Sequence, residues 1–278
     1  MADKDRWPKV ERELMRDLSR AVVGFRMIEE GDRLLVALSG GKDSYVLHHL
    51  LGNLARRAPV RFSLVAVHVD QGQPGHDPAP LVEALRARGA EVHVIRDETY
   101  PIVLQMTPPG KTCCSMCAKL RRAILYRAAD ELGCNKVALG HHRNDTLATL
   151  LLNLVFSGQL KAMPAKLVSR DGRHMVIRPL LYCDEEQIRQ LAEHHGYPIL
   201  PCGLCGSQAD QQRLAMNRLL AELEQRVPGA RTSMLAALAN VRTTHLLDTG
   251  LWQRLGLPVA QEGRDGLEDE DVPPGLAI

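Results

Sequence analysis

Residues 34–47 read LLVALSGGKDSYVL and give the first indication of the architecture. Five apolar residues, Leu34–Leu38, predict a buried strand, and apolar residues at helical spacing over 46–51 predict a helix. A glycine-rich turn, Ser39–Ser44, joins the two. Its glycines allow close approach to a ligand, and the free N–H groups of the following helix attract anions. With Lys42 and two serine hydroxyls as further donors, this turn is predicted to bind phosphate.

The turn does not have the spacing of a Walker loop, which places four residues between the first glycine and Gly-Lys-Ser/Thr. Asp43 stands where such a loop has a hydroxyl, so we expect either Mg²⁺ between this carboxylate and the phosphates or a role of Asp43 on the nucleotide or pyrophosphate. The alternative is a turn that only packs a strand on a helix. The residues resemble the SGGxDS signature of the pyrophosphatase-loop ATP enzymes. That resemblance implies cleavage of ATP between its α and β phosphates and activation of a substrate as an adenylate.

The composition suits a protein with one large domain and a full hydrophobic core. The chain has 278 residues, of which 45% are hydrophobic, and a net charge of +2. The last 19 residues carry six acids and one base, so the rest of the chain is distinctly basic. A basic body is compatible with a nucleic-acid partner. Because only 4% of the residues are aromatic, RNA is expected to be held mainly through its phosphates.

The chain has no apolar run long enough to span a membrane, and its first residues lack the apolar core of a signal peptide. Seven cysteines are an odd number. We therefore expect a cytoplasmic protein with no membrane partner, whose thiols are reduced and available for metal binding or catalysis.

Strands and helices are expected to alternate along the chain. Strands are predicted at 34–38, 61–70, 90–95, 136–140 and 175–180, and helices at 8–28, 81–88, 118–132, 146–156, 185–195, 209–223 and 232–241. This order predicts an α/β fold with a doubly wound, mostly parallel, Rossmann-like sheet of five strands. The resemblance to the pyrophosphatase-loop enzymes implies that this fold is similar to that of the adenine nucleotide α-hydrolases. We expect an N-terminal helix (1–30), an ATP-binding domain (31–200), a C-terminal helical segment (201–262) and a disordered acidic tail (263–278).

Ligands of such sheets bind beyond the carboxyl ends of the strands. The second predicted strand ends in His68 and Asp70, and the fourth leads into Gly140-His141-His142-Arg143-Asn144-Asp145. The predicted ATP site therefore comprises Ser39, Gly40, Gly41, Lys42, Asp43, Ser44, His68, Asp70, Gly140 and His141, with Lys42, Asp43 and Asp145 as catalytic candidates. The alternatives are that the histidines belong to the core and that Asp145 only caps a helix starting at Thr146.

Two cysteine pairs, Cys114-x-x-Cys117 and Cys202-x-x-Cys205, have the spacing of metal ligands. They lie too far apart in sequence for a zinc ribbon, whose pairs are separated by about 15–20 residues. Sulfur ligands suit either Zn²⁺ or an iron–sulfur cluster, so the residues alone leave both metals open. Cys113 could also pair with Cys117. Inert buried thiols are the alternative, and this is the reading given to Cys134 and Cys183.

Together, the phosphate loop, GKTCCSMCAKLRR, GHHRND, IRPL and PCGLCGSQ resemble the bacterial tRNA 2-thiocytidine biosynthesis family. The resemblance implies a [4Fe–4S] cluster held by Cys114, Cys117 and Cys205, with one iron open to carry sulfur. It also implies tRNA as substrate and a cysteine desulfurase as sulfur donor. The chain departs from the family at Asn144, where relatives commonly have an acid. A basic group, Lys111, Lys119, Arg121 and Arg122, is predicted to contact anticodon-loop phosphates, the alternative being a solvated helix face.

The predicted reaction is the ATP-dependent conversion of an anticodon-loop cytidine to 2-thiocytidine, and the enzyme could form a homodimer. Adenylation of the C2 oxygen would create a leaving group that sulfur displaces. Two other functions remain open: a ligase of the 2-thiouridine, lysidine or amide-forming type, and a nucleotide-binding protein with a structural zinc.

Overall fold

The computed structural model describes residues 6–107, 114–200 and 208–257. The chain divides into two compact units, Met1–Arg231 and Thr232–Ile278. The first contains the sheet and every predicted site residue that the structure describes. Cys113, Cys202, Cys205, Lys111 and the acidic tail lie outside the described residues.

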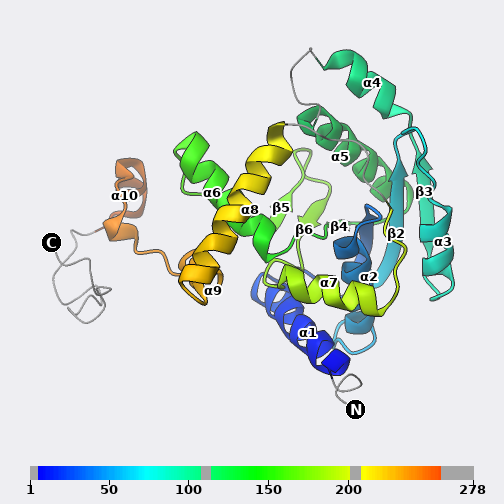
Figure 1. Cartoon of the computed structure of the whole chain (residues 1–278), viewed down its shortest axis with the longest axis horizontal. Helices are drawn as coiled ribbons and strands as arrows, with labels where there is room; N and C mark the ends of the chain where they lie inside the picture. The colour runs from blue at the N-terminus through cyan, green and yellow to red at the C-terminus, as the bar shows by residue number, and fades with distance from the viewer. Residues whose placement is uncertain (1–5, 108–113, 201–207, 258–278) are drawn as a thin grey trace. The chain divides into compact units, whose positions relative to one another are not determined.

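A six-stranded sheet forms the centre of the first unit (Figure 1). Its strands are β1 (Arg33–Leu38), β2 (Ser63–Asp70), β3 (Val92–Arg96), β4 (Lys136–Ala138), β5 (Lys166–Val168) and β6 (Met175–Ile177), in the order β3-β2-β1-β4-β6-β5. All neighbours pair in parallel except β5, which is antiparallel to β6. The α/β class and the parallel sheet are confirmed. The count of five strands was wrong, because β5 is a three-residue edge strand that lacks the buried apolar pattern of the others.

One face of the sheet packs against α1 (Arg6–Gly24), α2 (Lys42–Ala55), α3 (Ala79–Arg86) and α7 (Glu185–His194). Helices α1 and α2 bury leucines fully in this layer, among them Leu14, Leu18, Leu47 and Leu50. The opposite face is covered by α5 (Cys114–Glu131), whose Ile124 and Leu125 pack with Val65 and Val67 of β2. Apolar residues that point to both sides of each central strand therefore produce two cores, as expected for a parallel sheet.

Two further helices of the first unit, α6 (Arg143–Ser157) and α8 (Gln208–Arg226), pack against each other. Helix α9 (Ala230–Ala237) spans the boundary between the units, and the second unit contains a short 3-10 helix, η1 (Thr243–His245), and α10 (Thr249–Leu255). None of the helices in the described part of the chain is long and apolar enough to cross a membrane.

Several predicted helix boundaries were wrong. Helix α1 ends at Gly24, so Phe25 lies outside it and is 41% exposed. Helix α5 begins at Cys114, four residues earlier than predicted, and α6 begins at Arg143 instead of Thr146. Helices α4 (Thr99–Met106) and α10 were not predicted at all. Helix α4 contains Pro101, which is tolerated there because the first turn of a helix has no internal acceptors for its N–H groups.

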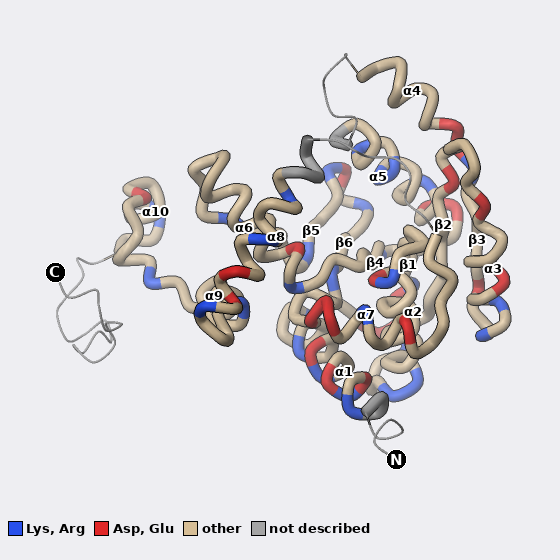
Figure 2. The backbone as a smooth tube through the Cα atoms, viewed as in Figure 1, with Lys and Arg blue, Asp and Glu red and all other residues tan. Residues whose placement is uncertain are grey.

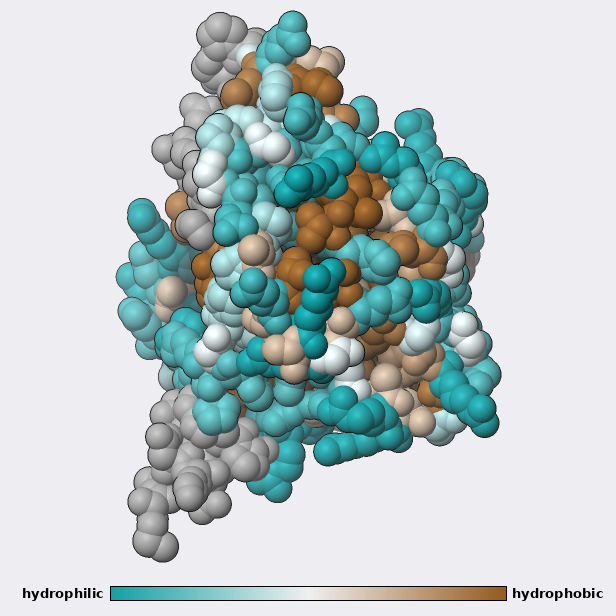
Figure 3. Space-filling view, turned by 90° about the vertical axis from the view of Figure 1, so that its right-hand side faces the viewer, coloured by the Kyte–Doolittle hydropathy of each residue, from teal (hydrophilic) through white to brown (hydrophobic). Residues whose placement is uncertain are grey.

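Side chains of α4 also contribute apolar surface. Ile102, Leu104 and Met106 are 45%, 54% and 59% exposed. Figure 3 views the molecule from the side of α3 and β3, which is mostly hydrophilic with hydrophobic patches.

The order of the strands determines where a ligand can bind. From β1 the chain passes outward through β2 to β3 and then returns to the other side of β1 as β4. The chain leaves β1 toward β2 on one side and enters β4 on the other side. Because the connecting helices lead away to opposite sides there, a crevice is left at the carboxyl ends of β1 and β4. The phosphate loop, residues 39–44, follows β1, and Leu139–Asp145 follows β4, so both predicted ligand segments meet at this crevice.

Candidate active site

The phosphate loop is held in a fixed shape before any ligand binds. Gly40 has a φ of +81°, and a Cβ added there would lie 2.8 Å from Leu200, so both backbone conformation and space require glycine. The Ser44 hydroxyl donates to the Gly41 carbonyl at 2.8 Å, and the Ser39 N–H donates to Ser44 Oγ at 3.2 Å. No side chain caps Gly41 at the start of α2. The first N–H groups of this helix are therefore directed to the crevice, as in an anion site.

The loop after β4 packs directly on the phosphate loop. A Cβ added at Gly140 would lie 3.2 Å from the carbonyl carbon of Asp43 and 3.3 Å from the Ser44 nitrogen. Gly140 therefore allows two backbone segments to approach at the crevice, which explains a glycine at this position without a direct role in ATP binding.

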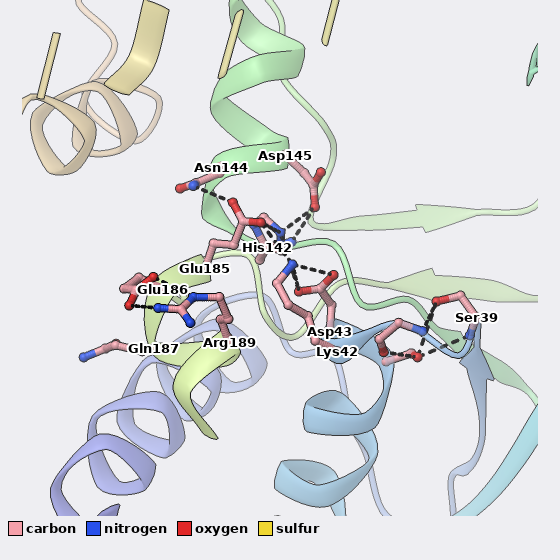
Figure 4. Close-up of polar contacts among 12 residues, drawn as sticks. Ser39, Lys42, Asp43, His142, Asn144, Asp145, Glu185, Glu186, Gln187 and Arg189 are labelled. Carbon is pink, nitrogen blue, oxygen red and sulfur yellow. Dashed lines mark hydrogen bonds and ion pairs between the residues drawn. The ribbon is translucent and has the colours of Figure 1, made fainter. Parts of the chain in front are cut away.

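A charged cluster lies beside the phosphate loop and consists of Lys42, Asp43, His142, Asp145 and Glu185 (Figure 4). Lys42 Nζ lies 3.0 Å from Glu185 Oε1 and 3.2 Å from Asp43 Oδ1. His142 Nε2 lies 3.5 Å from Asp145 Oδ2 and 3.7 Å from Asp43 Oδ1. The buried Oδ1 atom of Asp43 accepts no hydrogen bond within the described residues, so it can still bind a cation.

The ionic state of this cluster follows from its pairing. Burial opposes the charge of Lys42, but Asp43 and Glu185 outweigh it and raise the pKa of Lys42. Burial likewise disfavours the Glu185 carboxylate, but the hydrogen bond from Lys42 and the nearby His142 lower its pKa. Lys42 therefore stays cationic and Glu185 anionic at neutral pH.

Asp145 caps a helix, one of the two roles that the sequence left open, and its contact with Mg²⁺ or the nucleotide stays a prediction. Its Oδ2 accepts the backbone N–H of His142 at 3.1 Å and so caps α6, which begins two residues before Asp145. The same side chain lines the cavity described below and lies 4.0 Å from Arg213 Nη1 of α8. The neighbouring Asn144 donates to Glu185 at 2.9 Å, which explains how an amide serves at a position where an acid was expected.

A cavity of about 530 Å³ extends from the phosphate loop to the space between α5 and the sheet. The predicted residues that line it are Ser39, Gly41, Asp43, Ser44, His68, Gly140, His141, Asp145, Arg121 and Arg122. Gly40 supports the loop from outside this lining, and Lys42 is directed to Glu185. Asp70 does not line the cavity, because its carboxylate accepts the Gly72 N–H at 3.0 Å and lies 3.7 Å from Arg96. Lys119 is exposed on α5 and also lies outside the lining.

Two neutral histidines line the cavity. Burial lowers the pKa of His141 to about 4, an effect that Asp145 opposes and Arg178 reinforces. His68 donates from Nδ1 to the Leu38 carbonyl at 2.8 Å, so its Nε2 accepts from His76 Nε2 at 2.8 Å. Burial also lowers the pKa of His68. Both rings are uncharged at neutral pH, and the His141 Nδ1 atom has no hydrogen-bond partner among the described residues, so it is free to bind a ligand group.

The first cysteine pair stands at the start of α5, which runs along the cavity. Cys117 is a free, half-buried thiol whose Sγ donates to Gln71 Oε1 at 3.4 Å. Arg121 donates to the same oxygen at 2.7 Å, and Gln71 donates to Thr99 at 2.9 Å. Cys114 lies one helical turn before Cys117. Cys134 and Cys183 are buried away from this region, as expected for small hydrophobic residues, and burial raises the pKa of each thiol. That they are inert stays a prediction.

Sequence reasoning did not assign a role to three residues that the structure places at the site. Glu185 holds Lys42, Gln71 contacts both Cys117 and Arg121, and Arg178 lines the far part of the cavity. Arg178 lies within the IRPL motif, and Gln71 follows the second predicted strand, so position in the sequence was a usable signal for both. The sequence predicted Glu185 only as the first residue of a helix, and nothing in it indicated a role at the site.

Comparisons with known proteins agree with this geometry. Residues 9–199 match the model of the PP-loop domain family. The tRNA-cytidine(32) 2-sulfurtransferase of Sorangium cellulosum is 57% identical over 264 residues, which cover 95% of this chain and 93% of the relative. The protein of the same description from Escherichia coli is 47% identical over 269 residues, covering 95% and 86%. The solved U34-tRNA thiolase NcsA of Methanococcus maripaludis, described with its [4Fe–4S] cluster, superposes with a TM-score of 0.65 at 23% identity over 91% of both chains, a likeness of fold.

Proposed function

Because the chain belongs to the family of PP-loop tRNA-cytidine(32) 2-sulfurtransferases, we propose that it converts cytidine 32 of tRNA to 2-thiocytidine with consumption of ATP. The observation that best supports this reaction is one cavity that runs from the phosphate loop to α5, the helix that bears Cys114 and Cys117. The proposed activating residues and the helix that bears the proposed sulfur-handling cysteines therefore border one space.

In the proposed first step, the C2 oxygen of cytidine attacks the α-phosphate of ATP, and pyrophosphate leaves with the electrons of the broken P–O bond. The N–H groups at the start of α2 and the Ser39 and Ser44 hydroxyls would bind the pyrophosphate. Lys42, kept cationic by Asp43 and Glu185, would move from its ion pair to the phosphates as charge develops there.

The chain fits Mg²⁺ at this step. Asp43 offers a buried carboxylate oxygen without a hydrogen bond, and Asp145 lies on the other side of His142. No group of three or more metal-ligating side chains is arranged around one point in the described residues. That arrangement suits Mg²⁺, which is commonly bound by one or two carboxylates together with phosphate oxygens and water.

In the proposed second step, a sulfur nucleophile at the oxidation level of sulfide adds to C2, and AMP leaves with the former C2 oxygen. The neutral His141 ring lies on the cavity wall, where it could accept a proton that is released in this exchange. The apolar walls, such as Leu125 and Val176, would exclude water, which would otherwise hydrolyse the adenylate.

The described part of the cysteine region also fits an iron–sulfur cluster. Cys117 is a reduced thiol beside Gln71, and the Arg121 guanidinium is bonded to the same amide oxygen, so a positive charge lies where an anionic cluster would be held. Cys114, Cys117 and Cys205 would hold it. When bound, such a cluster would supply the sulfur that is transferred. A cysteine desulfurase as sulfur donor, a homodimeric state and a cytoplasmic location stay predictions.

The test is mass spectrometry of tRNA nucleosides from a strain that lacks the gene and is complemented with variants of this chain. Wild type should restore 2-thiocytidine, Cys117→Ser should not, and the matched control Cys134→Ala should. A wild-type chain that leaves 2-thiocytidine absent would refute the proposed reaction. Full restoration of 2-thiocytidine by Cys117→Ser would refute the role of this cysteine in sulfur transfer.

A further inference from the structure

Arg178 is a buried cation without a carboxylate partner among the described residues. It follows β6, which lies two strands along the sheet from β1 and its phosphate loop, is 9% exposed and lines the cavity. Its Nη1 donates to the Pro164 carbonyl at 2.6 Å, and its Nε is buried without a hydrogen-bond partner. Burial and the nearby Arg122 both lower the pKa of Arg178. A guanidinium stays charged under these conditions, so the cavity contains an uncompensated positive charge.

A second arginine lies nearby. Arg122, on α5, lines the cavity from an exposed position and has no ion pair within the described residues. Figure 2 marks the basic positions along α5. Tyr126, one turn further along the helix, also lines the cavity, and its ring is stacked on that of His174 with the centroids 5.5 Å apart. One guanidinium is therefore at the opening and the other inside, with apolar and aromatic surface around them.

The acidic residues that line the cavity, Asp43 and Asp145, belong to the charged cluster at the phosphate loop. The two ends of the cavity thus differ in charge. The loop end can accept the phosphates of ATP and a cation, whereas the part lined by Arg122 and Arg178, the arginine end, offers two guanidinium groups. An anion at the arginine end would satisfy Arg178, while a neutral base would leave both charges uncompensated.

We propose that Arg178 and Arg122 bind the backbone phosphate of the nucleotide that is modified. This inference rests on the proposed function. With its phosphate at the arginine end, the nucleotide would lie across the apolar middle of the cavity and direct its base to the ATP bound at the phosphate loop. Arg122 would meet the phosphate at the opening, and Arg178 would fix it inside. These arginines are positioning residues, because they orient the nucleotide and do not take part in bond formation.

The experiment measures binding of anticodon stem–loop RNA to full-length, anaerobically purified protein. One RNA is unmodified, and two others carry a neutral methylphosphonate on the 5′ or the 3′ side of the target cytidine. One of these neutral linkages should weaken binding to the wild type about tenfold, the effect of a lost charge-assisted contact. Arg178→Met should bind unmodified RNA more weakly by a similar factor. Its affinity should not fall further when the RNA carries that methylphosphonate. Its salt slope, d log K/d log[salt], should become shallower by ~0.7.

Three controls make the result interpretable. Arg122→Met tests, at an exposed position where folding is not at risk, whether the variant and the methylphosphonate again weaken RNA binding non-additively. Arg173→Met removes an arginine that is 62% exposed, paired with Asp130 and Asp171, and outside the cavity, so it should bind all RNAs as wild type does. ATP affinity should be unchanged in Arg178→Met and Arg122→Met.

The proposal would be overturned if, in both arginine variants, each methylphosphonate weakened RNA binding by the same factor as in the wild type, so that the losses of affinity were additive. So would a fall in ATP affinity without a fall in RNA affinity, or a gain of activity on RNA with uridine at the target position, which would show that Arg178 reads the base. If the wild type makes no 2-thiocytidine, the proposed function fails. If it does and the losses are additive, only this inference fails.

Discussion

At the scale of single residues, the site depends on a few positions where a side chain would occupy space that the backbone needs. Gly40 is the clearest, because it combines a φ of +81° with the 2.8 Å contact that a Cβ would make with Leu200. The Leu200 N–H also donates to the Gly40 carbonyl at 3.0 Å, so the segment after α7 is hydrogen-bonded to the phosphate loop. A change at Gly40 is therefore transmitted to both segments.

We expect Gly40→Ala to lower the free energy of unfolding by ~1–2 kcal/mol, since a non-glycine residue is strained at this φ. ATP affinity should fall at least about tenfold, because the loop N–H groups move away from the phosphates. Urea denaturation and calorimetric ATP binding measure the two effects. Gly52→Ala is the matched control: it lies inside α2, and an added Cβ would have only Arg56 Nη1 within 4 Å, at 3.9 Å. Unchanged ATP affinity in Gly40→Ala would show that the loop is not the phosphate site.

A second residue-scale prediction concerns α1, which the sequence set apart as an N-terminal segment. Leu14 is fully buried, and its carbonyl accepts from Cys183 Sγ at 3.7 Å, so the helix is part of the core. Leu14→Ala should cost 2–5 kcal/mol of unfolding free energy by roughly the rule for buried leucines. Val23→Ala, at a side chain that is 75% exposed on the same helix, should change it by less than about 0.5 kcal/mol. Equal effects in urea denaturation would contradict the packing of α1.

At the scale of elements, α7 connects the core to the charged cluster. Asp184 accepts the N–H groups of Glu186 and Gln187 and also pairs with Arg143 at the start of α6. The next residue, Glu185, holds Lys42. Asp184 is therefore the N-cap of α7, and this cap also fixes the direction in which Glu185 leaves the helix.

Asp184→Ala should destabilise α7 by ~1 kcal/mol, the usual cost of losing an N-cap. Hydrogen exchange followed by mass spectrometry should show faster exchange in peptides of α7 and of the phosphate loop. Asp248→Ala removes the corresponding cap of α10, where Asp248 accepts the Leu251 N–H at 2.8 Å. It should accelerate exchange in α10 alone. Faster exchange of the phosphate loop in Asp248→Ala, or none in Asp184→Ala, would contradict this account.

The elements also show which parts of the structure the sequence could predict. Strands with continuous apolar runs, such as β1 and β2, were found because burial on both faces leaves a strong signal. β5 was missed because Leu167 and Val168 are exposed at an edge, so they carry no alternation. In the site, glycines and charged residues near strand ends could be predicted. The contacts of Gln71 with Cys117 and of Glu185 with Lys42 could not, because the partners are distant in sequence and meet only after folding.

At the scale of the whole molecule, the buried histidines make stability depend on pH. Burial, reinforced by His49, lowers the pKa of His48 to about 4, and burial lowers the pKa of His141 to about 4 as well. In the unfolded chain a histidine titrates near its ordinary pKa of about 6.5. Between pH 4 and 6.5 the unfolded chain therefore binds more protons than the folded one, so stability rises with pH across this window and is lost as pH falls through it.

We expect His48→Gln to flatten this pH dependence, because glutamine removes the proton that the unfolded chain gains. His48 lies in α2, apart from the charged cluster, and the full effect of its shift is at most roughly 3 kcal/mol between pH 6.5 and 4. Urea denaturation at pH 4.5, 5.5, 6.5 and 7.5 measures it. Asp32, whose pKa is lowered because the bonds from Lys136 and Asn135 outweigh its burial, acts in the same direction only below its ordinary pKa of 3.8. Asp32 therefore does not contribute to the pH dependence of stability between pH 4 and 6.5. His93→Gln, on a side chain that is 38% exposed, is the control and should keep the wild-type slope. An unchanged slope in His48→Gln would mean that His48 is charged in the folded protein and that the layer of α2 is more open to water than the structure indicates.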